Sequence, residues 1–208
     1  MLESVYKFDW NVFQFIETYL WNPVLDTVLK IITTTGKWGA IFLVIAVGLF
    51  VYGFFTRKDK QKQAAMAVAF SVLVMELISN LIVKDAIARP RPFNFDWSQF
   101  AWAGQFNFPE IVSRPDSFSF PSGHAASAFA GAFALNRYYK KWGVCAYVFA
   151  VIMAFSRVYL HVHYCTDVLA GAVFGILYGL IGYLIVKYTY RFFSEKIFAP
   201  IEKVILKK

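Results

Sequence analysis

Charged residues are scarce in this sequence of 208 amino acids. Asp, Glu, Lys and Arg together make up 16% of the chain, whereas they make up about 25% of an average soluble domain. Hydrophobic residues reach 59%, against about 45–50% in soluble proteins. The shortage of charge argues against an ordinary soluble domain, and the excess of apolar residues indicates a membrane protein.

Cysteine is also nearly absent. Cys145 and Cys165 are the two in the chain, and they form neither a disulfide framework nor a zinc-ligand pattern, so we expect both to be unpaired. The opening stretch, MLESVYKFDWNVFQ, lacks a basic segment followed by an apolar core. No cleavable signal peptide is therefore expected.

Five apolar stretches approach the length of a membrane-spanning helix, which needs about 20 residues. The sequence predicts spans at Trp38–Phe55, Ala64–Val83, Ser122–Arg137, Trp142–Leu160 and Asp167–Tyr188. The second contains Glu76, Ser79 and Asn80, so one of its faces is expected to contact protein. We predict an all-α, polytopic transmembrane helix bundle that forms a single domain over residues 1–208.

Two segments outside these spans have a distinct composition. Residues 1–37 are apolar but interrupted by Glu17, Pro23 and Asp26, which favours interfacial helices over a sixth span. The segment 84–121 is rich in Trp, Phe and Pro and is too long for a simple connection, so we expect a structured loop.

The net charge is +8, which in a soluble protein would suggest a nucleic-acid partner. Here the basic residues cluster at 56–63, 136–142 and 189–208, segments that share one side if five spans alternate. The positive-inside rule makes that side cytoplasmic, so we expect a plasma (inner) membrane protein and no nucleic-acid partner. The tail 189–208 is predicted to be a basic amphipathic helix on the inner surface. All three histidines then lie on the extracellular or periplasmic side.

The first cluster of candidate site residues contains Lys84, Arg89 and Arg91. Such residues at the end of a span are usually membrane-edge anchors. These three, however, lie on the outer side, against the charge bias, which favours a bound anion. Arg can hold two phosphate oxygens at once, and Lys adds a point charge.

The second cluster is Pro121-Ser122-Gly123-His124, directly before an apolar run. Ser122 and Gly123 can start a helix whose free backbone N–H groups favour an anion. The alternative is a turn in which Ser122 only caps the helix. His124 is a functional candidate in either case, because an ionisable side chain at the end of a span is costly.

The third cluster ends in His161, His163, Cys165 and Asp167. All four are possible metal ligands, but no HExxH or paired CxxC pattern accompanies them, and Arg157 and the neighbouring cations would repel a divalent ion. We therefore expect neither a metal nor another cofactor.

His163 and Asp167 are four residues apart and share a helix face if a helix begins there. Asp167 could then orient the imidazole and leave its other nitrogen as a nucleophile. His161 lies off that face and is interpreted as a packing or lining residue. The groups together predict a metal-free phosphoryl-transfer site, in which His163 attacks phosphorus and His124 protonates the leaving oxygen and then activates water.

The three clusters resemble the signature of the type 2 phosphatidic acid phosphatase (PAP2) superfamily. Its motifs are Lys, six residues and Arg-Pro; Pro-Ser-Gly-His; and Ser-Arg, five residues, His, three residues and Asp. The matching positions are Lys84, Arg91, Pro92, Pro121, Ser122, Gly123, His124, Ser156, Arg157, His163 and Asp167. The resemblance covers residues 84–167.

The resemblance implies a nucleophilic His163 oriented by Asp167, with His124 as the acid. It also implies that Lys84, Arg91, Arg157, Ser122 and Gly123 bind phosphate. The implied protein is a membrane lipid phosphatase whose site lies at the outer membrane surface.

We expect hydrolysis of a lipid phosphate or diphosphate, with undecaprenyl diphosphate favoured and phosphatidylglycerophosphate as another substrate. No residue decides between them, and nothing in the sequence predicts an oligomeric state. The alternatives are a lipid phosphotransferase that uses the same residues and a non-catalytic protein that binds or transports lipid phosphates. The second alternative has no need of the His163 and Asp167 pair.

Overall fold

The computed structural model describes residues 2–35, 39–104, 106 and 108–206, and every regular element within these ranges is a helix. Within them, three helices are long and apolar enough to cross a membrane: Asp59–Asn94, Lys140–Tyr159 and Cys165–Ile205. Ala40–Phe55 is a shorter apolar helix. The predicted all-α transmembrane bundle is confirmed, whereas the choice between five and six spans stays a prediction.

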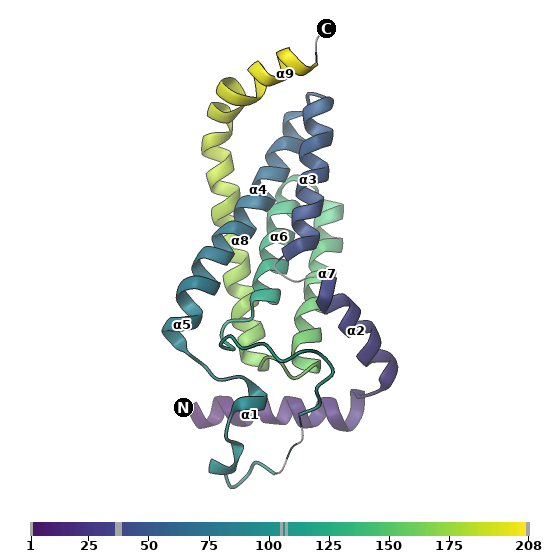
Figure 1. Ribbon diagram of the computed structural model, residues 1–208, viewed down its shortest axis with the longest axis vertical. Coiled ribbons are helices and arrows are strands. Elements are labelled where there is room, and N and C mark those ends of the chain that lie inside the picture. The colour runs from purple at the N-terminus through teal and green to yellow at the C-terminus, as the bar shows by residue number, and fades with distance from the viewer. Residues whose placement is uncertain (1, 36–38, 105, 107, 207–208) are drawn as a thin grey trace.

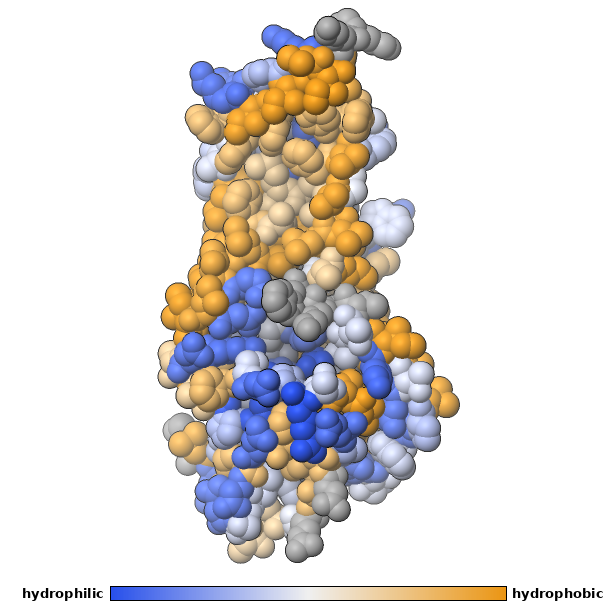
Figure 2. All heavy atoms as spheres, in the orientation of Figure 1, coloured by the Kyte–Doolittle hydropathy of each residue, from blue (hydrophilic) through white to orange (hydrophobic). Residues whose placement is uncertain are grey.

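Five helices run along the long axis of the molecule (Figure 1). They are α3 (Ala40–Phe55), α4 (Asp59–Met75), α6 (Gly123–Tyr138), α7 (Lys140–Tyr159) and α8 (Cys165–Phe193). Each covers most of one predicted apolar stretch, although Trp38 lies outside the described residues. Apolar side chains cover much of the visible bundle surface in Figure 2, as expected for a surface in contact with lipid.

Helix α6 packs against α4, α7 and α8. Its buried positions are mostly small residues: Ala125, Ala126, Ser127, Ala128, Ala130, Gly131, Ala132 and Ala134. In a membrane, helices associate through close packing rather than through the hydrophobic effect, and small side chains allow their backbones to approach. The high alanine content of this stretch therefore places α6 inside the bundle.

Three glycines of α8 face α6 at intervals of four residues. A Cβ atom on Gly171 would lie 2.7 Å from the Ser122 carbonyl oxygen, and one on Gly175 would lie 2.4 Å from the Ala126 carbonyl oxygen. A Cβ on Gly179 would lie 2.7 Å from the Phe133 Cβ. The two helices are therefore in backbone contact, and the starts of α6 and α8 are held together.

The polar residues of the second predicted span do face protein. Helix α4 continues as a π-helical segment, η3 (Glu76–Val83), and a short helix, α5 (Lys84–Ile87). The Ser79 hydroxyl donates to the Tyr178 hydroxyl of α8 at 3.0 Å, and the Asn80 side-chain amide donates to Glu76 at 2.5 Å.

At one end of the bundle, α1 (Leu2–Phe15) runs across the ends of the long helices (Figure 1). Its continuation is η1 (Ile16–Leu20), and α2 (Pro23–Thr35) then leads back toward the bundle. Trp10 and Phe13 are buried, whereas Phe8 and Phe15 are exposed. This two-sided pattern is typical of a helix that lies in the membrane interface.

The loop between α5 and α6 is structured, as predicted. It contains two short 3₁₀ helices, η4 (Pro92–Asn94) and η5 (Trp97–Gln99). The buried Trp97 ring packs against Tyr6 and Trp10 of α1 and against Tyr164, which directly precedes α8. The loop is thus held between α1 and the start of α8.

At the opposite end, α8 continues into η6 (Ser194–Phe198) and α9 (Ala199–Ile205). The buried Lys62 ammonium pairs with Glu202 at 2.6 Å and with Asp59 at 3.0 Å. The tail helix expected over 189–208 is therefore present within the described residues and docks on α4. Lys207 and Lys208 lie outside the described residues.

The contact between α6 and α8 leads to a stability prediction. Replacing Gly175 by Ala forces a methyl group onto the α6 backbone and should lower the free energy of unfolding by about 1–3 kcal/mol. Gly48→Ala is the matched control, because a Cβ there meets nothing within 4 Å. Denaturation by SDS in mixed micelles measures both variants, and equal stability of the two would contradict the close contact.

Candidate active site

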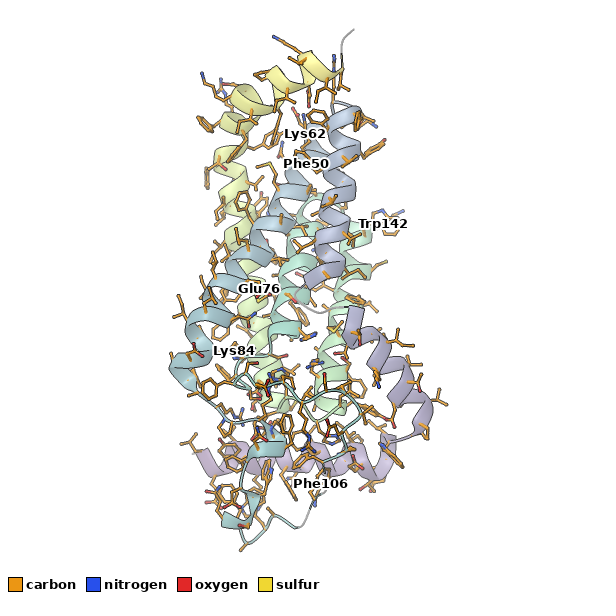
Figure 3. The ribbon with its side chains drawn as sticks, in the orientation of Figure 1. Phe50, Lys62, Glu76, Lys84, Phe106 and Trp142 are labelled. Carbon is orange, nitrogen blue, oxygen red and sulfur yellow. The ribbon has the colours of Figure 1, made fainter. Side chains whose placement is uncertain are left out.

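Most of the predicted site residues line one cavity of about 370 Å³ at the α1 end of the bundle. Lys84, Arg91, Gly123, His124, Arg157 and His163 all line it. Ser122 and Asp167 are buried in the layer behind it. The remaining lining residues are Thr33, Thr34, Glu76, Asn80, Val112, Ser113, Pro115 and Ser117. Figure 3 shows Lys84, the first residue of α5, closer to the α1 end of the bundle than Glu76, the first residue of η3.

His163 has its two ring nitrogens in different surroundings. Nε2 lies 3.2 Å from Nη1 of Arg91, at the cavity wall. Nδ1 faces the Ser119 hydroxyl at 3.4 Å and Oδ2 of Asp167 at 3.5 Å. An arginine N–H can only donate, so the Nε2 lone pair accepts from Arg91 and the proton of a neutral ring lies on Nδ1.

Burial, reinforced by the positive charges of Arg91, Arg157 and Lys84, lowers the pKa of His163 well below its usual value. The imidazole is consequently neutral at neutral pH. A neutral imidazole whose Nε2 carries no proton is the form that can act as a nucleophile.

Asp167 is completely buried and accepts several hydrogen bonds in the first turn of α8. Oδ2 accepts from the Ser119 hydroxyl and, at 3.1 Å, from the Tyr164 backbone N–H. Oδ1 accepts from Nη1 of Arg89 at 2.6 Å. Because α8 begins at Cys165, His163 precedes the helix. The two side chains therefore meet across the helix start rather than on one helix face.

Arg91 is fixed by its own loop, between α5 and α6, and by the segment between α7 and α8. Its Nε donates to the Ser117 carbonyl at 2.7 Å and its Nη1 to the Val162 carbonyl at 2.6 Å. Its Nη2 donates to the Ser117 hydroxyl at 3.0 Å and to the Phe118 carbonyl at 3.3 Å. The guanidinium is thus held in one orientation beside His163.

Arg157 and Ser122 retain hydrogen-bonding capacity. Nη1 of Arg157 donates to the Thr33 hydroxyl, but its buried Nε has no partner among the described residues. Ser122 stands at the N-cap of α6, yet its buried hydroxyl makes no capping bond and likewise has no described partner. Buried polar groups are nearly always paired, so these atoms are consistent with a site for an anion.

The N-terminus of α6 completes the cavity. Gly123 and His124 line the cavity, so the first amides of α6 lie beside it. A Cβ on Gly123 would lie 3.1 Å from Oδ1 of Asn80, so glycine at this position avoids crowding Asn80 at the cavity wall. With three cations around a helix N-terminus, the cavity can hold a tetrahedral anion.

Two partners of the site, Ser119 and Asp9, were missed from the sequence, and Arg89 has another role than the one expected. Ser119 and Arg89 both bind Asp167, and Asp9 of α1 binds Arg89 at 2.8 Å. Arg89 was expected to favour a bound anion, but it pairs with these two carboxylates. Ser119 and Asp9 carried no signal, because their partners are remote in the sequence.

His161 lies away from the cavity, in line with its interpretation as a packing residue. Its buried ring contacts Phe13, Phe106 and Phe108, with centroids 5.1–5.8 Å apart. Nε2 lies 3.5 Å from Oε1 of Glu17. Among the described residues, no group of three or more His, Cys, Asp or Glu side chains could hold a metal ion. Cys145 and Cys165 are free.

Comparisons with known proteins agree on a family. Residues 64–191 match the sequence model of the PAP2 superfamily. A lipid A 1-phosphatase of Rhizobium johnstonii is 36% identical over 115 residues, which cover 54% of this chain and 43% of that protein. An undecaprenyl-diphosphatase of Sulfolobus acidocaldarius is 32% identical over 103 residues, covering 49% and 46%. The chain thus matches less than half the length of these two relatives.

Two solved structures have the same fold. A transmembrane PAP2-type phosphatidylglycerolphosphate phosphatase of Bacillus subtilis has a TM-score of 0.60 and 27% identity, covering 93% of this chain and 88% of that one. LpxE of Aquifex aeolicus has a TM-score of 0.59 and 24% identity, covering 83% and 92%.

The unpartnered Nε of Arg157 leads to a binding prediction. Arg157→Gln should weaken the binding of orthovanadate, a phosphate analogue, by about 10- to 100-fold, since a hydrogen bond from a charged donor is lost. Arg114→Gln is the control, because Arg114 is exposed and does not line the cavity. Calorimetric titration in detergent compares the two. Equal losses of orthovanadate affinity in the two variants would mean that only the overall charge of the protein attracts the anion.

The enclosed ring of His161 leads to a pH prediction. Burial lowers its pKa to about 4, so the unfolded state binds a proton more readily between about pH 6.5 and 4. Stability is then lost as the pH falls through this range. When the pH falls from 7.5 to 5, the free energy of unfolding should drop by about 2 kcal/mol more in the wild type than in His161→Asn. Asn suits the positive φ of this residue. Unfolding at the two pH values measures the difference, which should be absent if His161 is already charged.

Proposed function

This chain belongs to the PAP2 superfamily, and on that basis we propose that it hydrolyses phosphate or diphosphate groups of membrane lipids. The reaction passes through a phosphohistidine and needs no metal ion. The observation that carries the proposal is the position of His163. His163 lines a cavity with three cations; its Nε2 lies beside Arg91, while its Nδ1 faces Asp167.

In the first step, Nε2 of His163 attacks the phosphorus atom and the bond from phosphorus to the leaving oxygen breaks. The negative charge of the bound phosphate favours the protonated form of His124. This imidazolium gives its proton to that oxygen, so the lipid leaves as a neutral alcohol or as a lipid monophosphate. Asp167 stabilises the positive charge that forms on the imidazole through the Nδ1 proton.

In the second step, His124 takes a proton from a water molecule and the resulting hydroxide attacks the phosphohistidine. The nitrogen–phosphorus bond breaks, inorganic phosphate leaves, and His163 returns to its neutral form. Lys84, Arg91 and Arg157 act in both steps, because they neutralise charge that spreads over the phosphoryl oxygens.

A lipid substrate is supported by the setting of the cavity. The cavity is lined by residues at the start of α5, at the start of α6 and near the end of α7, at one end of the apolar bundle, so the phosphate of a lipid can enter while its chains stay in the bilayer. A volume of about 370 Å³ has room for two phosphoryl groups. This room and the similarity to an undecaprenyl-diphosphatase support undecaprenyl diphosphate as the favoured substrate.

The orientation is proposed from charge. Arg57, Lys58, Lys60 and Lys62 lie where α3 meets α4, at the end of the bundle where α9 packs and opposite the cavity. The positive-inside rule places this end in the cytoplasm. The active site then faces the extracellular or periplasmic side of the plasma membrane.

The test is phosphate release in detergent with EDTA present, from undecaprenyl diphosphate, phosphatidylglycerophosphate, phosphatidic acid and glucose 6-phosphate. We expect turnover on lipid substrates that His163→Ala lowers by more than about a thousandfold. His161→Asn is the control, because it removes a histidine two residues away that does not line the cavity.

Three outcomes would contradict the proposal in different ways. Loss of activity with EDTA would indicate a metal-dependent reaction. A product in which the phosphoryl group is attached to a second lipid would indicate a phosphotransferase. Tight orthovanadate binding without turnover on any substrate would indicate a lipid-phosphate binding protein.

A further inference from the structure

Two charged residues outside the three motifs are bound to the catalytic pair. The Arg89 guanidinium lies between two carboxylates: Nη1 contacts Oδ1 of Asp167 at 2.6 Å and Nη2 contacts Oδ2 of Asp9 at 2.8 Å. Arg89 precedes the Arg91 motif position by two residues, whereas Asp9 belongs to α1. The chain of contacts therefore joins α1 to the residue that faces His163.

This chain of charges is shielded from water. Both carboxylates are 0% exposed and the Arg89 side chain is 11% exposed. The guanidinium also lies over the Tyr164 ring at 3.7 Å and the Tyr6 ring at 4.9 Å. A buried carboxylate stays ionised only when it is paired and hydrogen-bonded. Arg89 is the cation that meets this need for both acids.

Asp9 has a second contact with the start of α8. Its Oδ1 accepts from the Thr166 backbone N–H at 2.9 Å, and its Oδ2 accepts from the Thr166 hydroxyl at 2.7 Å. Burial raises the pKa of Asp9, and the bonds from Thr166 and Arg89 oppose this shift. A carboxylate of α1 thus caps the helix on which Asp167 stands and fixes the residue before it.

The two oxygens of Asp167 have separate partners. Oδ1 is taken by Arg89, whereas Oδ2 faces Ser119, the Tyr164 N–H and Nδ1 of His163. If Arg89 were released, Oδ1 would lose this charged partner and only the bonds to Oδ2 would hold the carboxylate. The contact with Arg89 therefore restrains the plane in which the carboxylate meets the histidine.

We propose that Asp9 and Arg89 are positioning residues, which hold Asp167 so that it orients His163 for attack on phosphorus. This inference rests on the proposed function, since it assumes that His163 is the nucleophile. It makes α1 part of the catalytic machinery rather than only an anchor. Asp9 reaches His163 only through Arg89, Thr166 and Asp167.

The test uses two anions as probes, so that it does not depend on lipid turnover. Vanadate adopts the five-coordinate geometry of phosphoryl transfer by bonding to a nucleophile and reports the orientation of His163. Sulfate remains tetrahedral and reports only the cation site. Asp9→Asn should weaken vanadate binding about tenfold and leave sulfate binding within about twofold. Glu3→Gln is the control on the same helix, because Glu3 is exposed and accepts a hydrogen bond from Trp102, away from Asp167.

A second arm repeats Asp9→Asn in an Asp167→Asn background. If Asp9 acts through Asp167, Asp9→Asn should lower vanadate affinity by less than about twofold in this background. If Asp9 has only a structural role, the substitution should lower the affinity as much as it does in the wild type. With an active lipid substrate, Asp9→Asn should lower kcat about tenfold and change KM less than about twofold. Arg89→Lys should likewise lower kcat and leave KM nearly unchanged, since lysine lacks the guanidinium group that contacts both carboxylates at once.

Two results would overturn the inference. One is vanadate binding that is unchanged in Asp9→Asn and Arg89→Lys. The other is an equal loss of vanadate and sulfate binding in these variants, which is also the result expected if they fail to fold. Failure of the proposed function looks different. The wild type would then bind vanadate with the predicted dependence on Asp9 but release no phosphate from any lipid.

Discussion

The ion pairs of Arg89 with Asp167 and Asp9 join segments of the chain that are remote in the sequence. Arg89 belongs to the loop after α5, Asp167 to the first turn of α8 and Asp9 to α1. Burying these charges without partners would cost several kcal/mol for each ion. The requirement that each charge be paired therefore restricts how the three segments can meet, and His163 lies beside the point where they do.

Packing of small residues brings the rest of the site to the same place. Because α8 has glycine at position 171, the start of α6 approaches it closely enough for the Ser122 N–H to donate to the Asp167 carbonyl at 3.1 Å. The helix N-terminus with Gly123 and His124 is thereby set beside the His163 loop. A side chain at position 171 would clash with the Ser122 carbonyl and hold the second and third motifs apart.

The cavity itself is left with unmet hydrogen-bonding capacity. Nε of Arg157, which lines the cavity, is buried without a partner among the described residues, and Arg91 and Lys84 add positive charge beside it. Such an arrangement is costly in the empty protein. It is useful in a site for phosphoryl transfer, because a bound phosphoryl group can satisfy the donors and neutralise the cations.

The sequence by itself determined the helical class, the membrane setting and the motif residues. These depend on local properties: the length of apolar runs, the alanine-rich stretch of α6 and the spacing of residues such as Ser156, Arg157 and His163. Only the tertiary structure decided that Ser122 leaves its hydroxyl free, that His163 precedes α8, and that Ser119, Arg89 and Asp9 support Asp167. These contacts join residues far apart in the chain, and they form only when α1 and the loop before α6 pack against the bundle. No local pattern of residues records that packing.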